Sequence, residues 1–262
     1  MRGILLTHGV AYRAAEWQTP APEPLSRRSR VSGTANPAHM VNYYQRVAEA
    51  AARAAGVSFE PVAHSVDTPM TLARDPRSEA LVDRLVGEAG AASMPLIALS
   101  PGAAYGGAKR WPLERLAQCG DALAARLGGV LVSTASRFEA DMGAEIERLA
   151  KSPVLRLGEL LDLPGLTALL RRAAVLVTND SGAMHIAAAT GTPTVAVFGP
   201  TDWNVTFPWA RRAAVVRESP GCAPCLLREC PIDHRCMQSV TAERVADAAL
   251  ALLGDPRGDA NA

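Results

Sequence analysis

Residues 175–200 constrain the fold of this chain more than any other stretch. An apolar, β-branched run at 175–178 leads into a polar turn at 179–182, and a helix of small residues follows at 183–190. A second apolar run occupies 194–198. This order of strand, turn, helix and strand predicts a doubly wound α/β sheet, in which ligands bind at the carboxyl ends of the strands.

The turn itself carries groups suited to a nucleotide-linked ligand. Ser181 and Gly182 begin the helix and offer backbone N–H groups to an anion, and Gly182 allows a close approach to the backbone. Asp180 can accept hydrogen bonds from ligand hydroxyls, and His185 follows about one turn later. The alternative is that Asp180 or Ser181 only caps the helix and His185 only packs at an interface.

From residue 94 onward, predicted strands and helices alternate regularly. Strands are expected at 96–100, 130–133, 154–157, 175–178, 194–198 and 213–216, and helices at 112–127, 138–150, 166–173, 183–190 and 241–253. Residues 94–262 therefore predict one complete Rossmann-like domain. Residues 1–93 contain a Pro- and Arg-rich loop and two helices, at 39–57 and 78–89, without a run of strands. We interpret them as the remnant of a preceding domain.

A glycine-rich loop, residues 101–112, follows the first strand of this domain. Its three glycines allow the backbone to curl round a phosphate, and Lys109 supplies a positive charge for it. Lysine is rare here, since only Lys109 and Lys151 occur. The loop matches no standard phosphate-binding motif, so a solvated surface loop is the alternative. Trp111 is expected to be a packing anchor.

Composition excludes several classes of protein. The formal net charge of +1 gives no reason to expect nucleic acid as a partner. No apolar run approaches the roughly 18 residues of a membrane span, and the first residues do not form a secretory signal. We expect a cytoplasmic protein, with peripheral contact with the inner face of the inner membrane left open.

Four of the five cysteines lie close together, at Cys222, Cys225, Cys230 and Cys236. Soft thiolate ligands on a short loop can complete a tetrahedral zinc site. The spacing differs from a pair of CxxC knuckles, so the expectation is no metal, with a thiolate site kept as an open alternative. Reduced structural thiols and an opportunistic disulfide are the other interpretations.

Three motifs together resemble a known family. SPGAAYGGAKRWP, NDSGAMHIAAATGTPTVAVFGPT and CAPCLLRECPIDHRCM, in this order, are similar to glycosyltransferase family 9, the heptosyltransferases of lipopolysaccharide inner-core assembly. The opening RGILLT and the helix near His39 resemble the end of that family's first domain. The resemblance implies a GT-B architecture, with two Rossmann-like domains across a cleft and the donor held by the second.

The resemblance also implies an activity and the residues that serve it. Members transfer heptose from ADP-heptose to a lipid A-core acceptor with inversion at the anomeric carbon, and need neither a metal nor another cofactor. The positions that match the family's donor-binding residues are Ala104, Tyr105, Lys109, Glu139, Asp180, Ser181, Gly182 and His185. Lys109 matches the lysine that neutralises the departing diphosphate, and Glu139 matches an acidic residue near the adenosine ribose.

One departure from the family pattern limits this expectation. The family begins with a strand and a Gly-Asp turn whose aspartate acts as the general base, and no such turn precedes His39. We therefore expect a chain that lacks the first part of the N-terminal domain, through a misplaced start or a gene fragment, and that binds donor but transfers poorly or not at all. Two alternatives remain: a GT-B transferase for another nucleotide sugar, and a non-catalytic nucleotide-binding or Cys-cluster metal-binding module. Oligomeric state is left open.

Overall fold

A computed structural model describes residues 29–30, 39–58, 66 and 70–254 of the chain. Its centre is a seven-stranded sheet with the order β1-β7-β6-β5-β2-β3-β4. Six strands run parallel, and β1 pairs antiparallel with β7. The strands are β1 (Ser29–Arg30), β2 (Leu96–Ser100), β3 (Val130–Ser133), β4 (Val154–Leu155), β5 (Val175–Asn179), β6 (Thr194–Phe198) and β7 (Ala213–Arg217).

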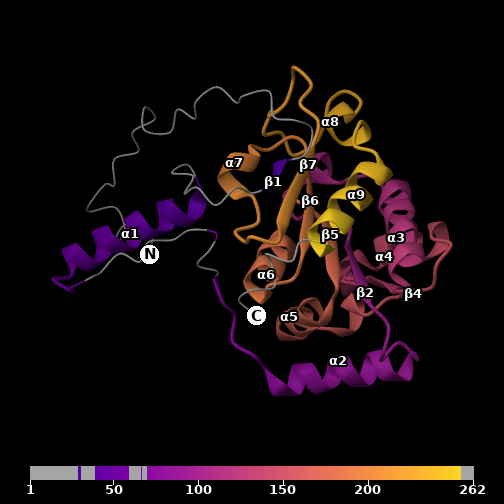
Figure 1. Cartoon of the computed structure of the whole chain (residues 1–262). Coiled ribbons are helices and arrows are strands. Elements are labelled where there is room, and N and C mark those ends of the chain that lie inside the picture. Colours follow the sequence, from indigo (N-terminus) through magenta and orange to yellow (C-terminus); the bar gives the residue numbers. More distant parts are fainter. Residues whose placement is uncertain (1–28, 31–38, 59–65, 67–69, 255–262) are drawn as a thin grey trace.

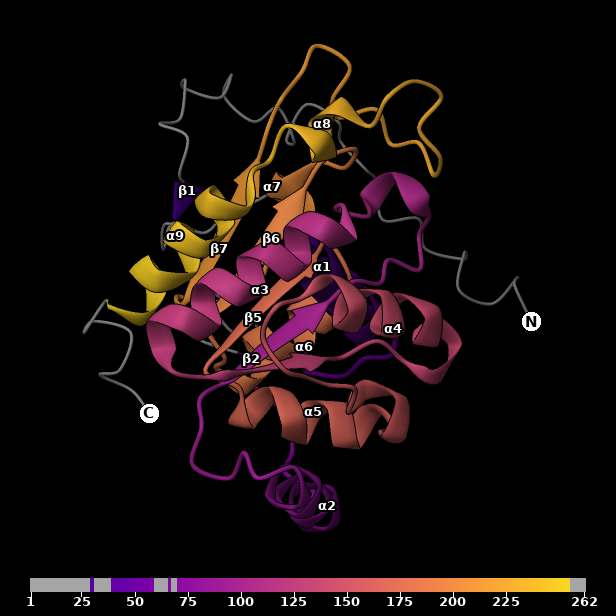
Figure 2. The same cartoon turned by 90° about the vertical axis from the view of Figure 1, so that its right-hand side faces the viewer.

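Helices cover both faces of the sheet (Figures 1 and 2). The helices are α1 (Met40–Ala54), α2 (Pro76–Glu88), α3 (Leu113–Leu127), α4 (Ala140–Leu149), α5 (Leu163–Arg172), α6 (Gly182–Thr190), α7 (Trp203–Thr206), α8 (Arg235–Gln238) and α9 (Ala242–Leu253). Helices α3 and α9 pack side by side on one face, and α5 lies between α2 and α6 on the other. Short 3₁₀ turns at Gly107–Lys109, Arg137–Glu139 and Gly158–Leu160 complete the described elements.

Strand β2 shows why the sheet is fully buried. Ile97 and Leu99 belong to the cluster formed with α3 and α9, whereas Leu96 and Ala98 pack with α2, α5 and α6. Because successive side chains of a strand point to opposite faces, a strand with helices on both sides must be apolar throughout. The continuous apolar runs in the sequence follow from this arrangement.

Several predicted boundaries shift for identifiable reasons. The helix predicted at 138–150 begins as a 3₁₀ turn, because Ser136 and Glu139 form a capping box, and only 140–149 is α-helical. The strand predicted at 154–157 has two residues, Val154 and Leu155, at the edge of the sheet. Helix α5 starts earlier than predicted, at Leu163, because the side chain of Asp162 caps it.

The region before residue 94 also contacts the sheet. Strand β1 extends the sheet beside β7, and α2 packs on α5 through Val82 and Val86. Helix α1 confirms the helix predicted at 39–57, but none of its residues is buried among the described part of the chain. Figure 1 shows α1 projecting away from the sheet. The opening RGILLT and the Pro- and Arg-rich loop fall outside the described residues, apart from Ser29 and Arg30.

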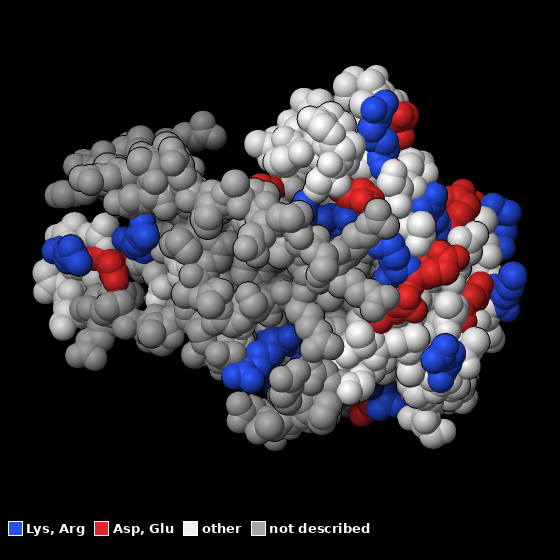
Figure 3. All heavy atoms as spheres, turned by 45° about the horizontal axis from the view of Figure 1, so that its top comes forward, with Lys and Arg blue, Asp and Glu red and all other residues white. Residues whose placement is uncertain are grey.

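Positive and negative side chains are intermixed on the described part of the face shown in Figure 3. None of the described helices combines the length and the apolar character required to cross a lipid bilayer.

Candidate functional site

The site lies where three neighbouring parallel strands end. Strands β6, β5 and β2 are adjacent in the sheet. Their carboxyl ends continue into the segment that starts at Gly199, the turn at 179–182 and the glycine-rich loop at 101–112. Segments far apart in the sequence therefore meet at one edge of the sheet, which is where doubly wound folds bind their ligands.

An ion pair between Lys109 and Asp180 forms the centre of this edge. Lys109 Nζ lies 2.5 Å from Asp180 Oδ2, and the two side chains are only 12% and 7% exposed. The hydroxyl of Thr201 also donates to Oδ2, at 2.7 Å, and that of Thr206 lies 3.5 Å from Oδ1. A lysine held in this way presents a fixed, poorly hydrated positive charge beside a group of hydroxyls.

Asn179 fixes the glycine-rich loop relative to this pair. Its Nδ2 donates to the carbonyl oxygen of Pro101 at 2.7 Å, and its Oδ1 accepts from the backbone N–H of Trp111 at 3.0 Å. The predicted role of Trp111 as a packing anchor is confirmed, because its ring is buried and its Nε1 donates to the carbonyl of Val240. One buried amide therefore ties both ends of the loop to β5.

No side chain caps the amino terminus of α6. Ser181 precedes the helix in extended conformation, and its hydroxyl pairs with that of Thr178 at 3.1 Å, not with a helix amide. The Asp180 carboxylate accepts from Lys109 and Thr201 through Oδ2, and not from an amide of the helix. The interpretation of these residues as simple helix caps is therefore wrong. A Cβ added to Gly182 would meet nothing within 4 Å, so the backbone there is open to a ligand.

His185 lies one turn into α6, partly buried and close to the ion pair. Burial lowers its pKa, and the nearby Lys109 lowers it further, while Asp180 acts in the opposite direction. The imidazole is therefore neutral at pH 7 and can either donate or accept a hydrogen bond.

Ala104 and Tyr105 are exposed on the glycine-rich loop. Lys109 Nζ lies 4.7 Å from the centroid of the Tyr105 ring, and the guanidinium of Arg228 lies 5.2 Å from it. The Tyr105 hydroxyl donates to the carbonyl of Leu226 at 2.7 Å. Tyr105 therefore joins the glycine-rich loop to the Cys-rich segment, residues 222–236, which contains Leu226 and Arg228.

Glu139 is also brought to the glycine-rich loop. Its Oε2 accepts hydrogen bonds from the backbone N–H and the hydroxyl of Ser136. Its carboxylate stands so close to Gly102 that a Cβ there would collide with it. The structure thus gathers all eight sequence-predicted residues on the glycine-rich loop, beside it, or on the turn and helix after β5.

Sequence reasoning missed several groups at this edge. Thr201 and Thr206 follow β6, the neighbour of β5 in the sheet. The feature of the sequence that could have indicated them is this position after the end of a predicted strand. His39, before α1, is 2% exposed. Its ring packs against Phe207 and Trp209, and its Nε2 bonds to the carbonyl of Phe207 at 2.9 Å. Burial lowers the pKa of His39 to about 4, with a smaller contribution from His185.

The five cysteines are all free thiols. Within the described ranges, no three Cys, His, Asp or Glu side chains are arranged so that they could hold a metal ion as they stand.

Curated relatives named as heptosyltransferases are similar to part of the chain. It is 32% identical over 163 residues to lipooligosaccharide heptosyltransferase 2 of Campylobacter jejuni, covering 60% of this chain and 51% of the relative. It is 36% identical over 129 residues to lipopolysaccharide heptosyltransferase 2 of Escherichia coli K12, covering 47% and 36%. The chain thus spans about half or less of the length of these relatives.

Solved structures have the same fold. The ADP-heptose LPS heptosyltransferase II of E. coli is 28% identical with a TM-score of 0.58, covering 70% of this chain and 53% of that one. A family 9 glycosyltransferase from Veillonella parvula is 23% identical with a TM-score of 0.67, covering 85% and 62%. These likenesses support the predicted GT-B type of α/β fold. The family model described as "Glycosyltransferase family 9 (heptosyltransferase)" matches residues 19–235, and the chain belongs to this family.

Proposed function

We propose that the chain binds ADP-heptose and belongs to an enzyme that transfers heptose to the inner core of lipopolysaccharide. The observation that carries the proposal is the buried pair of Lys109 and Asp180 beside the open amino terminus of α6. A cation and free helix amides at one sheet edge are suited to a diphosphate. Membership of the heptosyltransferase family supports a nucleotide-activated heptose as the donor.

In this proposal each residue has a defined role. The amides of Ser181 and Gly182 bind phosphate oxygens, and Lys109 neutralises the charge that ADP gains as the bond to the sugar breaks. Asp180 accepts hydrogen bonds from sugar hydroxyls and holds Lys109 in position. His185, neutral at pH 7, contacts the heptose or the diphosphate. Ala104 and Tyr105 border the phosphates, and Glu139 binds the adenosine ribose.

The proposed reaction is a direct displacement that inverts the anomeric centre. An acceptor hydroxyl of a heptosyl-Kdo-lipid A type core attacks the anomeric carbon, the bond to the diphosphate oxygen breaks, and ADP leaves with the electron pair. The acceptor proton passes to a general base, for which we assign no residue of this chain. Residues 94–262 would be the donor domain and residues 1–93 part of the acceptor side. Because this acceptor is a lipid, we expect the enzyme to act in the cytoplasm, at the inner face of the inner membrane.

Calorimetric titration of the full chain tests the donor assignment. We expect ADP and ADP-heptose to bind, and UDP and UDP-sugars to bind at least about tenfold more weakly. Equal binding of UDP-sugars would instead favour a transferase for another nucleotide sugar, and no binding of any nucleotide would contradict the proposal. A separate transfer assay, with ADP-heptose and a heptosyl-Kdo-lipid A acceptor, then tests catalysis.

A further inference from the structure

The charged residues of the candidate site do not balance the charge of a diphosphate. Lys109 is the one cation among the eight sequence-predicted residues, and Asp180 offsets its charge at 2.5 Å. Glu139 adds a second carboxylate, and His185 is neutral at pH 7 because burial lowers its pKa. Each phosphate of a nucleotide-sugar diphosphate carries a negative charge, which the partial positive charge at the α6 amino terminus offsets only in part. A further cation near Lys109 would complete the site.

Arg228 supplies a cation at this place. Its guanidinium lies 5.2 Å from the centroid of the Tyr105 ring, and Lys109 Nζ lies 4.7 Å from the same centroid. Both distances are within the range of cation–π contacts, so one ring carries both cations. The two charges are therefore no farther apart than about one Debye length at 0.1 M salt, about 10 Å. An anion bound beside the ring interacts with both of them.

The side chain of Arg228 is accessible to a ligand. Arg228 and Tyr105 are both exposed. Among the described residues, no carboxylate forms an ion pair with the Arg228 guanidinium. Other exposed arginines do form ion pairs with carboxylates, as in the case of Arg74, Arg148 and Arg235. A planar guanidinium can donate two parallel hydrogen bonds to one phosphate group.

Backbone contacts fix the position of Arg228 beside the glycine-rich loop. The N–H of Ala108 donates to the carbonyl of Arg228 at 2.9 Å. The neighbouring Glu229 accepts a hydrogen bond from the N–H of Gly107 through Oε1, also at 2.9 Å. A Cβ at Gly106 would collide with the carbonyl oxygen of Arg228, so the two backbones are in close contact. The backbone of Arg228 is thus held against the glycine-rich loop.

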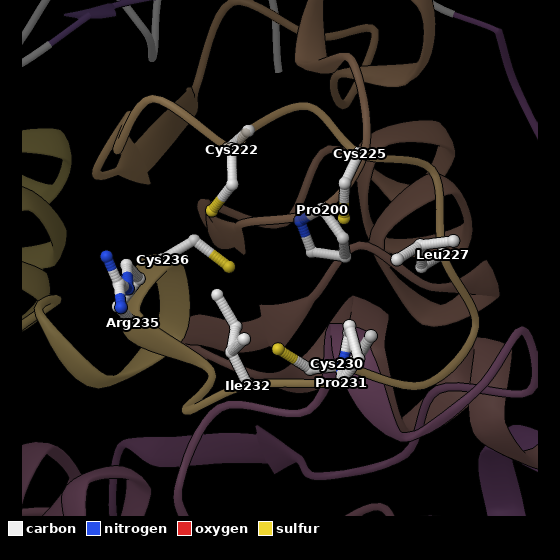
Figure 4. Close-up of a pocket in the computed structure, with 11 residues that line it drawn as sticks. Pro200, Cys222, Cys225, Leu227, Cys230, Pro231, Ile232, Arg235 and Cys236 are labelled. Atoms are coloured by element: carbon white, nitrogen blue, oxygen red, sulfur yellow. The ribbon is translucent and has the colours of Figure 1, made fainter.

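The two residues before Arg228 are anchored as well. Leu227 lines a small pocket of about 70 Å³ together with Ala108 and Pro200. Figure 4 shows Leu227 and Pro200 at this pocket. The N–H of Leu226 donates to the carbonyl of Pro200 at 2.8 Å. Because Pro200 follows β6, these contacts place Arg228 relative to the sheet as well as to the glycine-rich loop.

We propose that Arg228 is a further binding residue of the donor site and that its guanidinium contacts the diphosphate together with Lys109. The inference rests on the proposed function, because it takes the ligand to be a nucleotide diphosphate. A guanidinium stays protonated at all ordinary pH values, so Arg228 transfers no proton. It stabilises the negative charge of the bound donor and of the departing ADP. The alternative role is packing on the ring of Tyr105 without contact with the ligand.

Calorimetric titration of the full chain with ADP and with inorganic pyrophosphate tests this role. We expect Arg228→Ala to weaken the binding of both ligands about tenfold, and Arg228→Lys, which keeps the charge, to weaken it about threefold or less. Arg126→Ala is the matched control, because it removes an exposed positive charge from the last turn of α3. That turn precedes the start of β3 and so lies at the opposite edge of the sheet. The control should keep both affinities.

The salt dependence of binding separates a contact with the diphosphate from packing on Tyr105. The difference in ADP affinity between the unmodified chain and Arg228→Ala should shrink severalfold between about 0.05 and 0.5 M NaCl, because salt screens exposed charges. Arg228→Met keeps an apolar stem without the charge, and it should bind ADP as weakly as Arg228→Ala. Full ADP affinity in Arg228→Met, or a loss in Arg228→Ala that does not change with salt, would overturn the inference.

The outcomes also separate this inference from the proposed function. If the unmodified chain and Arg228→Ala bind ADP equally well, the proposed function stands and the role of Arg228 is wrong. If pyrophosphate binds through Arg228 but ADP does not bind, Arg228 is an anion-binding residue and the nucleotide assignment is wrong. If neither ligand binds to the unmodified chain, both proposals are wrong.

Discussion

The ammonium group of Lys109 and the carboxylate of Asp180 meet at 2.5 Å although 71 positions separate them in the sequence. Both are largely withdrawn from solvent, so each depends on the other to offset its loss of hydration. Asp180 holds the ammonium group of Lys109 in a fixed position before any ligand binds, so the proposed diphosphate site is preorganised. The pair is thus both a structural element and the proposed binding group.

Replacing Lys109 with alanine should weaken ADP binding by about 10- to 100-fold, because a charged hydrogen bond is worth about 1.5–3 kcal/mol. It should also lower the free energy of unfolding by about 1–3 kcal/mol, since the Asp180 carboxylate stays buried without its cation. Calorimetry and urea unfolding measure the two effects. Lys151→Ala is the matched control, because Lys151 is the other lysine and is exposed. If both variants bind ADP like the unmodified chain, the site is wrongly assigned.

Gly182→Ala separates ligand contact from stability. The added Cβ meets no protein atom within 4 Å, so the free energy of unfolding should stay the same or rise by up to about 1 kcal/mol. ADP affinity should fall about tenfold, because the methyl group occupies the space through which phosphate approaches the helix amides. Gly87→Ala in α2 is the control, since its Cβ also meets nothing and it should leave ADP affinity unchanged. Full ADP affinity in Gly182→Ala would place the phosphates elsewhere.

Asn179→Ala should destabilise the fold by about 1–3 kcal/mol in urea unfolding, because the buried carbonyl of Pro101 and the N–H of Trp111 lose their partner. Asn179→Asp keeps the acceptor for Trp111 but loses the donor to Pro101, so it should be destabilised as well. Wild-type stability in both variants would show that the amide does not tie the loop to β5.

Stability should rise with pH between about 4 and 6.5 because of His39. Its pKa is lowered to about 4 in the folded chain from an ordinary 6.5, so in this window the unfolded chain binds more protons than the folded one. The contribution of His39 to the free energy of unfolding is fully present above about pH 6.5 and is lost as the pH falls toward 4. It reaches at most about 3 kcal/mol. Urea unfolding at several pH values should show a shallower slope for His39→Phe. Equal slopes would mean that the ring is not held neutral.

The sheet could be predicted from the sequence because each of its parallel strands and main helices is marked by residues within or next to that element. Each buried strand is a short apolar run, and α3, α6 and α9 end or begin at recognisable residues such as Gly128, Gly191 and Thr241. The two-residue β1 and the short helices α7 and α8 carry no such pattern. Their positions depend on partners distant in the sequence, as the pairing of Ser29 with Val215 illustrates.

The candidate site was predictable in part for the same reason. Asp180, Gly182 and His185 lie on one continuous turn and helix, and their spacing alone brings them together. The contributions of Thr201 and His39 depend on which strands are neighbours and on where α1 begins. The contact between the Cys-rich loop and the glycine-rich loop, through Glu229 and Gly107, spans 122 positions and has no local signal.

The antiparallel pairing of β1 with β7 bears on how tolerant the sheet is to shortening of the chain. Parallel sheets end in rows of unpaired backbone groups that can recruit a strand from another molecule. The β4 edge is only two residues long, and β1 occupies part of the longer β7 edge through Ser29 and Arg30. A version that begins at residue 70 would keep every parallel strand but uncover β7, and its characteristic failure would be intermolecular strand addition and aggregation.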